Sequence, residues 1–175
     1  SSVSNELRTA TQALLPPLKA DHEVAAVLCR KVGLQSCKEL REAEVVAWCN
    51  KGLTAADLGL LGTLSSVLPA LVELILVEPA AGPDGVQRLA EGLGAGSLPA
   101  VGHLELEGFH MGDAGASALA AALGRGALPR LQCLWLDSNA IGDAGLVALA
   151  PALRRLPSLE FLGLRNNPLG DEGEK

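Results

Sequence analysis

The sequence is short of aromatic residues and of basic charge. Of its 175 residues two are Phe, two are Trp and none is Tyr, and 14 Lys and Arg stand against 20 Asp and Glu. The first fifty residues carry six charges of each sign, so the deficit of six lies in residues 51–175. Nucleic-acid-binding domains present a clustered basic surface. We therefore expect no nucleic-acid partner.

Long apolar runs are also missing. The longest stretch without a charged residue is Leu58–Val72, which has 15 residues and includes Pro69. A membrane-spanning helix needs about 20 apolar residues, so we expect no membrane-spanning segment. The chain opens on Ser1 and Ser2 without a basic and then apolar leader pattern, which indicates either a removed leader or a fragment.

The four cysteines show no metal-binding or redox spacing. They are Cys29, Cys37, Cys49 and Cys133, separated by 8, 12 and 84 positions, and no CxxC pair occurs. This usage favours free thiols in a reducing, intracellular compartment, with disulfides as the less favoured alternative. The sequence does not distinguish the cytosol from an organelle.

Leucine and alanine are abundant, and the leucines repeat with a fixed period. The chain has 35 Leu and 27 Ala, and Leu-Pro pairs at 68, 98, 128 and 156 open segments that are 30, 30 and 28 residues apart. In each segment an LxL motif alternates with the period of a half-buried strand, and apolar residues then recur at helical spacing. Asp113 and Asp143 stand at predicted helix N-caps. Each repeat is predicted to be a strand, a turn and a helix.

Residues 131–153 follow the pattern LxxLxLxxNxIGDxGxxxLAxxL. This pattern resembles the long, helical leucine-rich repeat of the ribonuclease-inhibitor type, and the resemblance extends over residues 68–175. It implies an α/β fold, a right-handed solenoid or horseshoe segment with a parallel β-sheet on the concave side and helices on the convex side. It also implies a protein ligand. The consensus asparagine, which ties the turn backbone of adjacent coils, is present at Asn139 and Asn167. Pro79 and Phe109 replace it in the first two repeats, where we expect less regular turns.

We divide the chain into an N-terminal helical cap (1–39), a degenerate first repeat (40–67) and leucine-rich repeats over 68–97, 98–127, 128–155 and, incomplete, 156–175. The cap is predicted to contain helices over 4–15 and 21–33 and a capping box from Ser36 to Glu39. In the degenerate repeat, Val46, Trp48 and Leu53 are predicted core residues and Thr54 begins a helix. The last repeat lacks the helix that would cover its leucines, so we expect either a longer natural chain or a partner that covers this C-terminal edge.

No motif indicates catalysis. His103 would lie near Glu73, Glu105 and Cys133, a conceivable metal corner, but outward strand positions commonly collect such polar residues without a metal. The glycine-rich segment 92–97 follows a predicted helix instead of preceding one, so it is predicted to be a helix end and not a phosphate-binding loop. We predict no enzyme activity, no cofactor and no metal.

Alternation directs the residues beside the core leucines onto the concave face. These positions form an acidic middle next to two aromatic residues, and an outward Trp beside charge is typical of an interface anchor. The predicted partner-binding residues are Trp135, Phe161, Glu73, Glu105, Glu107, Asp137, Arg165, His103, Ile75 and Val77. The alternative is that the aromatic residues only cover the sheet. We predict a protein-interaction module, a recognition scaffold or regulator; the alternatives are a structural subunit of a larger assembly, possibly organellar, and, more distantly, a small-GTPase activator.

Overall fold

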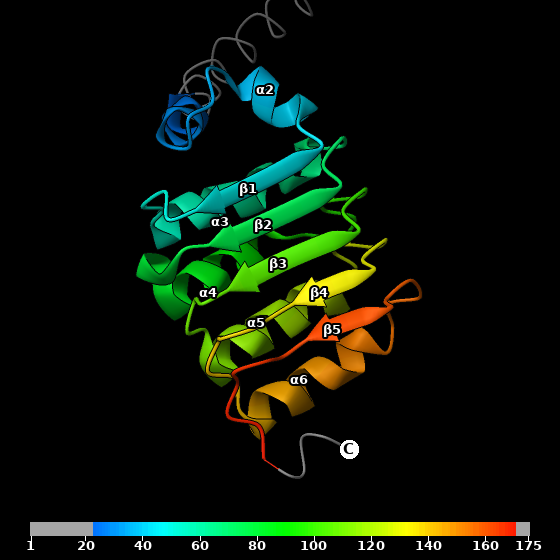
Figure 1. The fold of residues 1–175 in the computed structure, drawn as a ribbon. Helices are drawn as coiled ribbons and strands as arrows, with labels where there is room; N and C mark the ends of the chain where they lie inside the picture. Colours follow the sequence, from blue (N-terminus) through cyan, green and yellow to red (C-terminus); the bar gives the residue numbers. More distant parts are fainter. Residues whose placement is uncertain (1–22, 171–175) are drawn as a thin grey trace, which may run out of the picture.

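The computed structural model describes residues 23–170 and contains one parallel β-sheet. Its five strands are β1 (Val45–Cys49), β2 (Glu73–Val77), β3 (His103–Glu107), β4 (Cys133–Trp135) and β5 (Phe161–Gly163). They pair in chain order, each in register with the residue 28 or 30 positions further on. Figure 1 shows the strands stacked from one end of the sheet to the other. The predicted α/β class and parallel sheet are confirmed.

One helix follows each of the first four strands and packs on the same side of the sheet (Figure 1). These helices are α3 (Ala55–Leu64), α4 (Gly82–Gly92), α5 (Gly112–Gly124) and α6 (Asp143–Leu153), with short 3-10 helices at η1 (Ser65–Val67) and η2 (Pro79–Ala81). A helix over 23–31 and α2 (Cys37–Glu42) precede the sheet. The helix predicted over 4–15 and the start of the one predicted over 21–33 lie outside the described residues.

The core lies between the sheet and the helices. Inward strand residues such as Leu74, Leu104 and Leu134 are at most 1% exposed, and the residues between them are partly exposed. Val46 and Trp48 occupy the same inward positions in β1 and are buried. A parallel strand covered by helices on one face shows this alternation. The core positions predicted for the degenerate repeat are therefore confirmed.

A complete capping box begins α3, and its aspartate also bonds to the helix over 23–31. The Thr54 hydroxyl accepts from the Asp57 N–H, and the Asp57 carboxylate accepts from the Thr54 N–H at 2.8 Å. Lys31, on the helix over 23–31, donates to the same carboxylate at 2.6 Å. Burial acts to raise the pKa of Asp57, but the hydrogen bonds from Lys31 and Thr54, with the Lys31 charge, outweigh it and hold the pKa below its usual value of 3.8.

The capping box predicted at Ser36 forms only in part. The Ser36 hydroxyl accepts from the Glu39 N–H at 3.3 Å, as predicted. The Glu39 carboxylate, however, accepts from the N–H of Gln35 and not from that of Ser36. The reciprocal bond is displaced by one residue, to the N–H that precedes the N-cap.

The prediction that Asp113 and Asp143 cap their own helices is wrong. Helix α5 begins at Gly112 and α6 begins at Asp143, so both aspartates lie in the first turn, and neither helix has a side-chain N-cap bond. The Asp113 carboxylate accepts from the N–H groups of Gly142 and Gly145 at 2.7 and 2.9 Å, at the start of the next helix. Asp143 accepts from Gly170 in the same way. Both carboxylates therefore bond to the next coil, by which we mean the next strand together with the segment that follows it. Asp113 satisfies N–H groups at the start of α6, where a helix has no backbone partners for them.

The turns after β2 and β3 differ from the turn after β4. After β2 the chain forms η2 and then Gly82 at φ 59°, and after β3 Gly112 adopts φ 58°. The equivalent Gly142, after β4, is extended at φ −96°. Phe109 occupies the asparagine position after β3 and is completely buried. Its ring belongs to the core, where Cε1 is 3.9 Å from the position that a Cβ of Gly85 in α4 would take.

Two asparagines connect the coils beyond the ends of the strands. Asn139 is fully buried; its Oδ1 accepts from the Phe109 N–H at 3.0 Å, and its Nδ2 donates to the carbonyls of Leu106 and Asp137. One coil further, Asn167 Oδ1 accepts from the N–H groups of Asn139 and Ile141, and its Nδ2 donates to Leu136 and Leu164. Each amide satisfies backbone groups of its own coil and of the preceding one. These bonds fix the carboxyl ends of β3, β4 and β5.

Candidate functional site

The face of the sheet opposite the helices carries the residues that the sequence predicts to be outward. We call it the open face, since no described helix covers it (Figure 1). The register places outward residues of adjacent strands side by side, as in the row Ile75, Glu105, Trp135 and Gly163. Neighbouring strands lie about 4.8 Å apart. A row of side chains across the open face can therefore act as one surface.

Three rings form a zigzag ladder across β3, β4 and β5, because His103 and Phe161 lie in one row of the sheet and Trp135 lies two residues further along β4. The ring centroids of His103 and Trp135 are 6.3 Å apart with an interplanar angle of 24°, and those of Trp135 and Phe161 are 4.2 Å apart at 36°. Such offset pairs contribute about 0.5–1.5 kcal/mol beyond their buried area. Phe161 at the end of this aromatic ladder remains 41% exposed. The ladder therefore combines a fixed indole with an accessible ring.

Gly163 makes room for the indole of Trp135. A Cβ atom added to Gly163 would lie 2.8 Å from Trp135 Cε3 and 3.1 Å from Asp137 Oδ1. That approach to the indole carbon is shorter than van der Waals contact, so any side chain at this position would displace the indole. A glycine inside a strand often marks such a close approach. Gly163 is not among the predicted partner-binding residues, although a glycine in an outward strand position was an available signal.

Three carboxylates lie along one side of the ladder. Glu105, Glu107 and Asp137 line a hollow of about 250 Å³ together with His103 and Trp135. His103 Nε2 lies 3.8 Å from Glu105 Oε2, and all three acidic residues are partly exposed. No lining residue is Lys or Arg. A hollow lined by carboxylates and partly walled by protein concentrates negative potential and attracts cations.

Two ring nitrogens beside the hollow have no hydrogen-bond partner among residues 23–170. They are Trp135 Nε1 and His103 Nε2, and both atoms are buried. The indole N–H can only donate. A buried polar group without a partner costs about 1–3 kcal/mol.

The remaining predicted residues lie around this centre. Glu73, Ile75 and Val77 occupy the outward positions of β2, in register with His103, Glu105 and Glu107. Arg165 is exposed after β5, and its backbone N–H donates to Asp137 Oδ1 at 2.7 Å. All ten predicted open-face residues therefore lie on neighbouring strands or directly after them. Five of them line the hollow, and Phe161 joins it through the ladder.

The described part of the chain offers little for other kinds of site. Within residues 23–170 no three or more His, Cys, Asp or Glu residues lie close enough together to hold a metal ion. Over the same residues, no helix has the length and apolar character needed to cross a membrane.

Comparison with known families adds one match. Residues 128–150 match a family model described as Leucine Rich repeat. These residues belong to the repeat that follows the full sequence pattern, with β4, Asn139 and the first turns of α6. The match supports a leucine-rich repeat protein, a class that generally mediates protein–protein interaction and typically acts without catalysis. No curated protein matches the chain.

Proposed function

We propose that this protein is a non-catalytic interaction module that binds a basic or mixed-charge segment of a partner protein on its open face. The proposal rests on one observation above all: three carboxylates, an imidazole and an indole enclose one hollow on the uncovered side of the sheet. It includes a repeat geometry of the ribonuclease-inhibitor type, in which this side is the concave one. The role is that of a recognition scaffold or regulator.

Trp135 is the proposed anchor. The His103 and Phe161 rings and the backbone of Gly163 hold its indole in place before any partner arrives. A side chain that is already fixed loses little conformational entropy on binding. A few large residues near the centre of an interface contribute most of its binding energy, and Trp is among the most frequent of them. Phe161, which is more exposed, extends the anchor toward β5.

The hollow itself suits a cationic side chain, and we assign it to an arginine or lysine of the partner. A guanidinium carries five N–H donors and no acceptor, and Glu105, Glu107 and Asp137 offer only acceptors when ionised. A cation near the indole face also gains from the ring quadrupole.

The outward residues of β2 widen this surface. Ile75 and Val77 give partly exposed apolar area next to the acidic middle, and Glu73 adds a fourth carboxylate in register with His103. Charges of one sign around the anchor accelerate encounter with a basic partner more than they strengthen the final complex. Arg165 lies at the opposite edge and would meet an acidic residue of a mixed-charge segment.

Affinity capture from native tissue with crosslinking mass spectrometry tests this proposal. We expect crosslinks that map onto the outward residues of β2 to β5, and we expect the association rate to fall as salt is added. A Glu105→Gln, Glu107→Gln double variant should associate more slowly and lose part of the salt dependence. Crosslinks confined to α3–α6, or an association rate unaffected by both salt and the double variant, would contradict the proposal.

A further inference from the structure

Two of the four cysteines meet before the sheet begins. The sulfur atoms of Cys29, on the helix over 23–31, and Cys37, the first residue of α2, lie 3.7 Å apart. Both are thiols in this structure. A disulfide requires a sulfur separation of about 2.05 Å, so the two atoms need to approach by roughly 1.7 Å. The loop between them includes Gly33 at φ 90° and joins two short elements, so a small displacement suffices.

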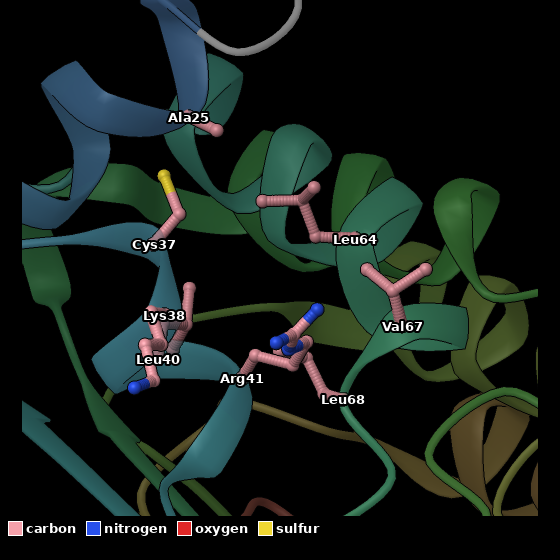
Figure 2. Close-up of a pocket in the computed structure, with 8 residues that line it drawn as sticks. All are labelled: Ala25, Cys37, Lys38, Leu40, Arg41, Leu64, Val67 and Leu68. Atoms are coloured by element: carbon pink, nitrogen blue, oxygen red, sulfur yellow. The ribbon is translucent and has the colours of Figure 1, made fainter.

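The two thiols differ in accessibility. Cys29 is 1% exposed, whereas Cys37 is partly exposed and lines a cavity of about 390 Å³. Figure 2 shows the Cys37 sulfur directed toward the helix that carries Ala25, with Lys38 and Arg41 among the other lining residues. A small oxidant in the cavity would therefore reach Cys37 before Cys29.

The environment of Cys29 also indicates that Cys37 reacts first. Burial, and then the hydrogen bond and charge of Cys37, raise the pKa of Cys29 to about 11. Cys29 is therefore a protonated, poorly nucleophilic thiol at neutral pH, because the thiolate is the reactive form. It is placed to act second, as the thiol that resolves an oxidised Cys37.

We propose that Cys29 and Cys37 are an oxidation site that closes to a reversible disulfide when the protein meets a peroxide. The Cys37 thiolate attacks one oxygen of hydrogen peroxide, the O–O bond breaks, and Cys37 becomes a sulfenic acid while the departing hydroxide takes up the thiol proton as water. The Cys29 sulfur then attacks the Cys37 sulfur, and the S–O bond breaks. The Cys29 proton leaves with that oxygen as a second water. The two thiols lose two protons and two electrons, which reduce the peroxide to two waters.

The other two cysteines provide an internal comparison. Cys49 lies on β1 and Cys133 on β4, with β2 and β3 between them. Three strand spacings separate those strands by about 14 Å, which is too far for a disulfide. The Cys29–Cys37 pair is also remote in the fold from the open-face hollow, since it precedes β1. Its oxidation is therefore independent of the proposed partner-binding function.

The test treats the folded chain with a modest excess of hydrogen peroxide, alkylates it with iodoacetamide under denaturing conditions and measures intact and tryptic masses. Before alkylation, we expect the intact mass of the oxidised protein to be lower than that of the untreated protein by two hydrogens. After alkylation, we expect two of its four thiols to remain unmodified. Trypsin cuts after Arg30, Lys31 and Lys38, so the peptide ending at Arg30 should be linked to residues 32–38. Dithiothreitol should reverse both changes.

Three variants separate the steps. A Cys49→Ser, Cys133→Ser double variant should still form the linked peptides. Cys29→Ser should stop at the sulfenic acid, which dimedone labels on Cys37, and Cys37→Ser should form neither product. The proposal is overturned if the wild-type chain keeps all four thiols, if peroxide oxidises Cys49 or Cys133 while Cys29 and Cys37 remain alkylatable, or if the linked peptides come only from dimers. The wild-type measurement decides the matter even if a variant does not fold.

Discussion

Replacing Asn139 with alanine should destabilise the protein by far more than the loss of one ordinary side chain. Asn139 is fully buried, and it is the partner of the Phe109 N–H, at 3.0 Å, and of the Leu106 carbonyl. Alanine leaves these two groups without that partner in a site from which water is excluded. Each unsatisfied buried group costs about 1–3 kcal/mol, so the expected loss is about 2–6 kcal/mol. The Asp137 carbonyl is less affected, because it also accepts from the Gly108 N–H.

Urea unfolding at neutral pH, followed by far-UV circular dichroism, measures this loss. Total stabilities of single domains are about 5–15 kcal/mol, so Asn139→Ala should lower the midpoint substantially. Asn139→Asp should be at least as costly, because a carboxylate has no N–H to donate and is itself buried. The matched control is Gln87→Ala, which removes an exposed amide from α4 and should change stability by less than about 0.5 kcal/mol. An Asn139→Ala protein as stable as the control would refute the role of the asparagine in joining the coils.

Three further changes follow from the same contacts. Folding lowers the pKa of Asp57, so the unfolded chain takes up a proton there at higher pH than the folded chain. The resulting stabilisation is complete above the unfolded pKa and is lost as the pH falls through 3.8 toward the folded pKa. In Asp57→Asn, the free energy of unfolding in urea should therefore depend less on pH in that window. Asp113→Ala should cost about 1 kcal/mol in urea unfolding by removing the cap of the next helix, and Asp113→Asn should cost less because the amide oxygen still accepts. Gly163→Ala should cost about 1–3 kcal/mol by overpacking and should shift the fluorescence of Trp135, measured in a Trp48→Phe background.

Each of these expectations has a contrary result. An unchanged pH profile in Asp57→Asn would mean that the bond from Lys31 does not persist in solution. If Asp113→Ala is as stable as the wild-type protein, Asp113 does not cap the next helix in solution. A Gly163→Ala protein with the wild-type emission spectrum would show that the indole does not lie over Gly163.

The parallel sheet could be predicted because its signal repeats. The LxL motif recurs at a spacing of 28 or 30 residues, and the observed register pairs residues at the same spacings. The core position of Trp48 followed from the same columns, although the repeat around it is degenerate. The cap at Thr54 was also predictable, since both of its partners lie within three residues.

The helix caps that reach from one coil to the next were not predictable from local pattern. The amides that Asp113 caps are 29 and 32 residues away, and a local capping rule assigns the carboxylate to its own helix instead. The residues that line the hollow could be predicted as outward ones, because alternation fixes which side chains of a strand point away from the core. The form of the hollow could not, since it depends on the tilt of the Trp135 ring and on the space above Gly163. The approach of Cys29 to Cys37 likewise depends on how a helix and α2 pack, which their spacing of eight residues does not specify.

The affinity of Trp135→Ala for the captured partner tests the central claim most directly. The measurement is an equilibrium titration of that partner with the wild-type protein, with Trp135→Ala and with Val147→Ser, a change on the exposed side of α6, where Val147 is 72% exposed. If Trp135 is the anchor, its loss costs about 2 kcal/mol, which raises Kd by roughly 30-fold, and Val147→Ser leaves Kd unchanged. A Kd that Trp135→Ala leaves at the wild-type value, or that Val147→Ser raises instead, would contradict binding on the open face.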